Sequence, residues 1–220
     1  MSTKIGIIAD TVTDTSMGKD FFESMGFEVV MRPVKENSLE CVRFFQQPEK
    51  ERNSYISALI NEIKSEGAKA IVVYANSICA YVNVDKLCAD SGMAVVTPFH
   101  AYKKLGEAYK KPCIWAATVG ALSGIENSLT ESNSSIEVCG LSNLSAAVQI
   151  EAGLSPAQVV KQNGFRELID FSEKAGCDCI ILGCTHFPYL MGELLPFASI
   201  PIIDPADIML DILRETLAEQ

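Results

Sequence analysis

Short apolar runs alternate along this chain with stretches whose apolar residues recur at helical spacing. The runs are rich in Ile, Val and Ala, and a glycine or proline often stands where an element ends. Buried β-branched runs separated by helical segments are typical of parallel strands joined by crossover helices. The pattern predicts strands over residues 4–9, 27–31, 68–74, 93–97, 113–117, 137–140, 177–182 and 201–203.

The segments between these runs predict helices. In residues 49–66, for example, Leu59, Ile60 and Ile63 fall on one helical face. A helix that ends at residue 25 has Thr15 or Ser16 as its candidate cap. The other helices are predicted over residues 82–91, 101–109, 120–129, 156–175 and 206–218.

The strands and helices form two successive, similar sets. We therefore expect an α/β fold with two similar lobes, each with a mainly parallel sheet flanked by helices. The chain order places residues 1–97 and 200–220 in the first lobe and residues 98–199 in the second.

One segment, residues 180–188 (IILGCTHFP), combines a strand with candidate chemistry. Gly183 allows a tight turn and leaves room beside it. Cys184 then follows the carboxyl end of a strand, where open α/β sheets place their ligands. The helix predicted to begin at Phe187 would favour a thiolate or a carboxylate there, and His186 could hydrogen-bond or protonate. The alternative is that Cys184 only packs, because free cysteines are often buried.

Composition limits the classes of protein that this chain can represent. It has 220 residues, of which 48% are hydrophobic and 21% charged, as in an ordinary globular protein. The net charge of −10 argues against non-specific nucleic-acid binding, and no apolar run reaches membrane-spanning length. Eight cysteines in strand-like stretches, with no leader sequence visible, predict reduced thiols in the cytoplasm. Because there are only two histidines and Cys177 and Cys179 are too close for a usual zinc pair, no metal site is expected.

Residues 183–188 (GCTHFP) resemble the second-cysteine motif of the aspartate/glutamate racemase family, whose members invert amino acids without a cofactor. The family's first motif follows an earlier strand, and residues 71–80 (IVVYANSICA) provide the matching segment. The family has Cys-Asn-Thr or Cys-Asn-Ser where this chain has Ala75, Asn76 and Ser77. The resemblance implies two pseudosymmetric lobes with the active site in the cleft between them, and no cofactor or metal.

Alanine at the position of the first catalytic cysteine has two explanations. Ala75 can be an engineered replacement that disables the site, or the protein can be a natural one-cysteine member, like the related arylmalonate decarboxylases. The intact Asn76 and Ser77 beside it favour a disabled racemase site. Cys79 lies a full helical turn beyond Ala75, and we expect it to be a packing cysteine.

Racemisation needs a base on one face of Cα and an acid on the other, and two thiols can fill both roles. Hydrogen bonds to the substrate carboxylate must stabilise the developing carbanion. The resemblance makes Cys184 the remaining catalytic thiol and Ala75 the position of the missing one. It also implies that His186 and Glu151 assist Cys184, although Glu151 can equally be a solvated side chain.

The expected substrate-binding residues are those that resemble the family's contacts at strand ends: Asp10, Thr11, Asn76, Ser77, Thr118 and Thr185. Asp10 could bind the substrate ammonium group or orient a catalytic cysteine, and Asn76 with Ser77 resembles the carboxylate-binding pair. Each position also has a structural alternative, because Asp, Asn and Ser are common helix caps and Thr is common at strand ends.

We therefore predict a PLP-independent racemase of aspartate or glutamate, or both, impaired by Ala75 and assembled as a homodimer. One alternative is a cofactor-free one-cysteine decarboxylase or lyase, in which Cys184 protonates an enediolate. The other is a ligand-binding relic without turnover. The natural residue at position 75 distinguishes them, since cysteine there means an engineered variant and alanine favours the lyase or the relic.

Overall fold

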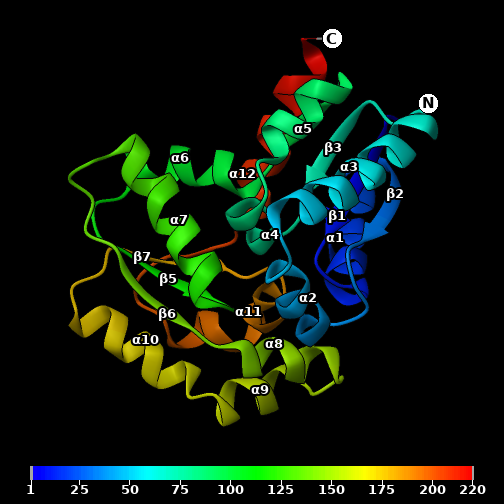
Figure 1. Cartoon of the computed structure of the whole chain (residues 1–220). Coiled ribbons are helices and arrows are strands. Elements are labelled where there is room, and N and C mark those ends of the chain that lie inside the picture. Colours follow the sequence, from blue (N-terminus) through cyan, green and yellow to red (C-terminus); the bar gives the residue numbers. More distant parts are fainter. Residues whose placement is uncertain (1, 220) are drawn as a thin grey trace. The chain divides into compact units, whose positions relative to one another are not determined.

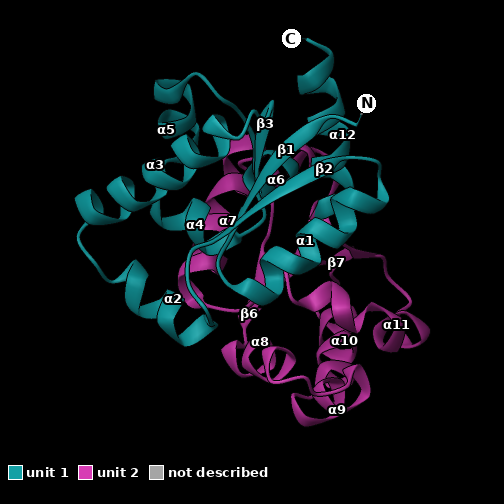
Figure 2. Cartoon of the chain, turned by 90° about the vertical axis from the view of Figure 1, so that its right-hand side faces the viewer, with its two compact units in different colours: residues 1–101, 206–220 teal, residues 102–205 magenta. Residues whose placement is uncertain are grey.

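The computed structural model describes residues 2–219, and the chain divides into two compact units (Figure 2). Unit 1 consists of residues Met1–Ala101 and Ala206–Gln220, and unit 2 of residues Tyr102–Pro205. The lobe limits expected from the sequence, residues 1–97 with 200–220 and residues 98–199, stay a prediction.

Unit 1 is built on a parallel sheet with the strand order β2-β1-β3-β4 (Figure 1). The central strands carry almost only buried residues, as in parallel sheets whose two faces are covered. The strands are β1 (Lys4–Ala9), β2 (Glu28–Pro33), β3 (Ala70–Val73) and β4 (Ala94–Val96).

The helices of unit 1 pack closely on this sheet. A glycine is needed at position 6 in β1, because a Cβ there would overlap the side chain of Ile63. The helices are α1 (Val12–Ser24), α2 (Ser38–Phe45), α3 (Glu49–Ser65), α4 (Asn76–Tyr81), α5 (Val84–Ser91) and α12 (Pro205–Ala218), and α6 (Pro98–Ala108) continues into unit 2.

Unit 2 repeats the same arrangement with a parallel sheet of order β6-β5-β7-β8. Its strands are β5 (Pro112–Ala116), β6 (Cys139–Ser142), β7 (Cys179–Gly183) and β8 (Ile202–Ile203). Its α-helices are α7 (Val119–Ser132), α8 (Leu144–Glu151), α9 (Pro156–Gln162), α10 (Phe165–Lys174) and α11 (Met191–Leu194), with the 3₁₀ turns η1 (Phe187–Leu190) and η2 (Leu195–Phe197). Two parallel sheets flanked by helices confirm the predicted α/β fold with two lobes.

None of the helices within residues 2–219 is long and apolar enough to cross a membrane.

Several predicted helix limits are wrong. The helix expected over 156–175 is two helices, because Gly164 takes a left-handed conformation (φ +66°) between α9 and α10. The first helix begins at Val12, and its cap is Thr11 rather than Thr15 or Ser16. Helices α2 and α8 were not expected, since they are short and have no long periodic pattern.

Gly183 ends β7, but its role differs from the tight turn that the sequence predicts. Its backbone is not in the positive-φ region, so the strand end does not require a glycine conformation. A Cβ there would instead lie 2.7 Å from Cδ1 of Ile125 and 3.2 Å from the carbonyl oxygen of Trp115. Close packing against unit 2's own core is therefore what excludes a side chain.

Replacing Gly183 by alanine is expected to lower the free energy of unfolding by about 1–3 kcal/mol, the usual cost of overpacking a core. Urea denaturation followed by circular dichroism measures it. Gly192→Ala is the matched control, because no atom lies within 4 Å of a Cβ at that position in α11, and we expect no loss of stability there. Equal stability of the two variants would contradict the packing explanation.

Candidate functional site

Cys184 directly follows β7, at the carboxyl end of the unit 2 sheet. Its side chain is buried, with 5% of the residue exposed, so a ligand there would meet the sulfur in a largely water-free environment. The Sγ atom lies 3.7 Å from Nδ1 of His186. A thiol and an imidazole at this distance can share or exchange a proton.

His186 also contacts a carboxylate. Its Nε2 lies 3.2 Å from Oε1 of Glu151, the last residue of α8, and His186 is buried while Glu151 is half-buried. When Nε2 carries a proton toward the carboxylate, Nδ1 presents its lone pair to the Cys184 thiol, and Glu151 stabilises an imidazolium if the thiol proton moves to the ring. The structure thus aligns a thiol, an imidazole and a carboxylate inside unit 2 (elements β7 and α8 in Figure 2).

The backbone after Cys184 differs from the expected helix start. Phe187 begins the short 3₁₀ turn η1 rather than an α-helix, and its N–H donates to the carbonyl oxygen of Cys184 at 3.0 Å. This amide is therefore already used inside the turn, and the expected helix N-terminus for binding an anion is absent at this place among the described residues. Thr185 is half-buried between Cys184 and His186.

Thr118 lies at the same edge of the sheet as Cys184. Ala116 of β5 pairs with Gly183 of β7, so both chains leave the sheet next to each other. Thr118 is the N-cap of α7, and its hydroxyl oxygen accepts from the N–H of Ala121 at 3.2 Å. A hydroxyl that accepts one hydrogen bond can still donate its own hydrogen to a carboxylate.

Unit 1 places the other predicted residues at the matching edge of its own sheet. Ile8 pairs with Val73, so Asp10 and Ala75 both follow the carboxyl ends of adjacent strands. The hydroxyl of Ser77 donates a hydrogen bond to Oδ2 of Asp10. Residues far apart in the sequence are therefore joined at one point of unit 1.

Thr11 is fully buried and has a structural function as the cap of α1. Its N–H and hydroxyl both donate to Oδ1 of Asp14, at 2.7 and 3.0 Å, and the N–H of Asp14 donates back to its Oγ1. These bonds form a capping box. Thr11 is therefore engaged in fixing the backbone that carries Asp10.

Position 75 is the N-cap of α4, with extended backbone (φ −162°) and no exposed surface. Alanine gives this helix no side-chain cap, and the buried Asn76 and half-buried Ser77 follow as its first residues. Burial raises the pKa of the Cys79 thiol well above its usual value, and the nearby carboxylates of Asp85 and Asp10 raise it further. Cys79 is thus poorly suited to replace a missing thiolate base.

Sequence reasoning did not foresee one group of side chains in unit 2. Cys113, Cys139 and Cys177 stand at or near the starts of three strands, and their sulfur atoms all lie within 4.8 Å of one another. The signal in the sequence is a cysteine within each of three predicted strands, and the pairing of the strands brings these cysteines together.

Comparison with known proteins supplies the remaining evidence. Residues 40–213 match the family model described as Asp/Glu/Hydantoin racemase. Glutamate racemase 1 of Caldanaerobacter subterraneus subsp. tengcongensis is 25% identical over 193 residues, which cover 81% of this chain and 67% of that protein. The chain spans 61–67% of the length of the glutamate racemases that it matches.

Two solved structures with the same fold are named for activities that differ from each other. Glutamate racemase from Francisella tularensis subsp. tularensis SCHU S4, crystallised with D-glutamate, superposes with a TM-score of 0.71 at 15% identity, over 99% of this chain and 82% of that one. A variant of arylmalonate decarboxylase superposes with a TM-score of 0.63 at 15% identity, over 98% of this chain and 93% of that one. Since the family model covers most of the chain, this protein belongs to the Asp/Glu/Hydantoin racemase family.

Proposed function

We propose that this protein is a PLP-independent racemase of an acidic amino acid, aspartate or glutamate or both, that uses thiol and thiolate chemistry and is impaired by Ala75. The observation that carries the proposal is the aligned Cys184, His186 and Glu151 at the end of β7. A buried thiol with an adjacent, carboxylate-bound imidazole is suited to moving a proton to and from carbon.

In this proposal the thiolate of Cys184 removes the proton from Cα, and the electron pair of that C–H bond stays on the substrate as a carbanion. His186 accepts or returns the thiol proton, and Glu151 is a positioning residue that holds the imidazole. Inversion requires a second proton donor on the opposite face of Cα. The methyl group of Ala75 cannot provide one, so the chain is left with one half of a two-base reaction.

Substrate binding is assigned to polar side chains that follow strand ends. Asp10, held by Ser77, is assigned to the substrate ammonium group. Asn76, Ser77, Thr118 and Thr185 are assigned as hydrogen-bond donors to the carboxylate. Thr11 contributes by fixing the backbone of Asp10 through its capping box.

We expect the protein to bind an acidic amino acid although Ala75 limits turnover, because losing a thiol removes a proton carrier but few hydrogen-bond donors. Asn76→Ala should weaken that binding by about 1–3 kcal/mol if a buried carboxylate loses its partner. Isothermal titration with both enantiomers of aspartate and glutamate measures it. Asn61→Ala, on the exposed surface of α3, removes the same amide elsewhere in unit 1 and should leave affinity unchanged.

The same titration separates the alternatives. A one-cysteine decarboxylase or lyase is favoured by Ala75 and is compatible with the fold shared with arylmalonate decarboxylase. Binding of an arylmalonate, with no binding of the four amino acids at millimolar concentration, would replace the racemase proposal by the lyase. Binding of amino acids without any reaction at Cα, even after restoration of a thiol at position 75, would identify a ligand-binding relic.

Location and assembly belong to the same proposal. All eight cysteines are free thiols in the structure, which supports a reducing compartment such as the cytoplasm. The homodimer stays a prediction, and sedimentation analysis of the purified protein tests it.

A further inference from the structure

Three cysteines of unit 2 gather at the amino ends of its strands. Cys113 is the second residue of β5, Cys139 is the first residue of β6, and Cys177 precedes β7 by two residues. Cys113 and Cys139 are direct neighbours across the two parallel strands. All three sulfur atoms lie within 4.8 Å of one another. Cys184 follows the opposite, carboxyl end of β7, so this cluster is separate from the site described above.

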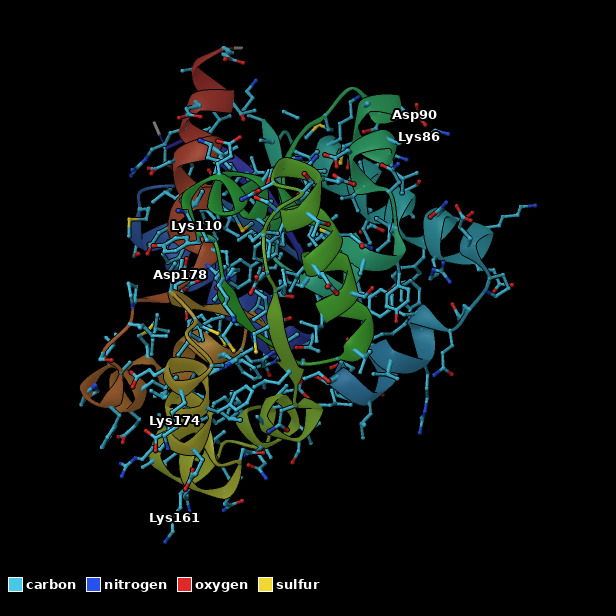
Figure 3. All side chains as sticks on the ribbon, turned by 90° about the vertical axis from the view of Figure 1, so that its left-hand side faces the viewer. Lys86, Asp90, Lys110, Lys161, Lys174 and Asp178 are labelled. Atoms are coloured by element: carbon cyan, nitrogen blue, oxygen red, sulfur yellow. The ribbon has the colours of Figure 1, made fainter. Side chains whose placement is uncertain are left out.

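Hydrogen bonds hold the chain beside Cys177 against the segment that leads into β5. The N–H groups of Lys110 and Lys111 donate to Oδ2 of Asp178 at 2.7 and 3.1 Å, and the N–H of Asp178 donates to the carbonyl oxygen of Lys111 at 3.0 Å. Figure 3 shows Lys110 and Asp178 next to each other at this edge of the unit. These bonds fix the segment that carries Cys177 to the start of β5, so the thiols are preorganised.

The thiols of Cys113 and Cys177 are buried, and Cys139 is half-buried. Thiolates in such a place repel one another, and a cation bound between them removes both the repulsion and the cost of burying charge.

We propose that Cys113, Cys139 and Cys177 bind one thiophilic metal ion, such as Zn²⁺ or Cu⁺, through three thiolates. Sulfur is the ligand that these ions prefer, and a metal about 2.3 Å from each sulfur holds the sulfur atoms about 4 Å apart, which is compatible with three sulfur atoms that lie within 4.8 Å of one another. As each sulfur–metal bond forms, the thiol proton leaves to solvent. Cys139 is half-buried, which gives the ion and a water ligand access from outside.

The ion would be structural rather than catalytic. It would join the starts of β5, β6 and β7, and it lies at the end of β7 away from Cys184. The inference does not depend on the proposed racemase activity, and metal binding can be tested without any substrate.

The reduced, metal-free protein is titrated with Cd²⁺, and binding is followed by the ultraviolet absorption of cadmium–thiolate bonds. We expect one equivalent to bind, to raise the melting temperature, and to displace Zn²⁺ from the zinc-loaded protein, because the softer Cd²⁺ binds thiolates more tightly. Cys139→Ser and Cys177→Ser should each weaken binding at least about tenfold, because a thiolate ligand is lost. Cys79→Ser, which changes the other half-buried cysteine and lies in unit 1, should bind like the parent protein.

A second measurement uses the unmodified chain, in case a serine variant does not fold. Bound Cd²⁺ should slow alkylation of Cys139 and Cys177, mapped by mass spectrometry, and should leave the alkylation rate of Cys79 unchanged. The proposal is overturned if no ion binds to the reduced protein. It is also overturned if one equivalent still binds with parental affinity to both serine variants, or if Cd²⁺ leaves the alkylation of Cys139 unchanged.

Discussion

Replacing Ala75 by cysteine is expected to raise the rate of racemisation of aspartate or glutamate by about 10²–10⁴-fold, the usual contribution of one positioned general acid or base. Position 75 caps α4 at the end of β3, directly before Asn76 and Ser77, and shares its sheet edge with Asp10. The change therefore adds a proton carrier beside groups that are already assigned to substrate binding. Chiral chromatography of both enantiomers of both amino acids, in each direction, measures the gain.

The matched control places a thiol elsewhere on the same helix. Ala80→Cys adds a cysteine to α4 one turn further along, where it has no assigned role, and we expect no gain in activity. Circular dichroism verifies that both variants fold. A folded Ala75→Cys protein that racemises neither amino acid in either direction would remove the main support for a disabled racemase.

The chain as it stands is expected to exchange the Cα hydrogen of one enantiomer with deuterated solvent while forming little of the other. The reason is that Cys184 can remove the proton and return a deuteron from the same face, whereas Ala75 offers no donor on the other. Cys184→Ser should slow this exchange by about 10²–10⁴-fold, because a serine hydroxyl stays protonated near neutral pH, whereas a thiol can ionise and act as a base. Proton NMR records the loss of the Cα signal with time.

Two further variants show whether the exchange depends on the aligned side chains. Cys79→Ser removes a cysteine from unit 1 and should leave the exchange unchanged. Glu151→Gln keeps the shape of the side chain but removes the charge 3.2 Å from Nε2 of His186, and we expect an intermediate loss with a changed pH profile. Equal exchange of both enantiomers, unaffected by Cys184→Ser, would show that Cys184 does not carry the proton.

Local sequence patterns determined the elements and the fold class of this protein. Buried β-branched runs such as residues 70–73 and 179–182 have only one stable environment, the interior of a parallel sheet, and the structure has strands at both places. Motif resemblance also identified the family, because residues at strand ends keep a fixed spacing from the strand that positions them. These features depend on neighbours in the chain, so one sequence is sufficient to read them.

Tertiary structure alone decided which of these residues meet. Strand register brings Ser77 to Asp10, and the position of α8 brings Glu151 to His186; both pairs lie too far apart in the chain for any periodicity to connect. Helix limits at Thr11 and Gly164 followed from hydrogen bonding and backbone conformation rather than from apolar spacing. The sequence predicts reduced thiols in strand-like stretches, whereas pairing of β5 with β6 makes neighbours of Cys113 and Cys139. The physical reason is that a site is a set of distances between elements, and those distances arise only when the sheet assembles.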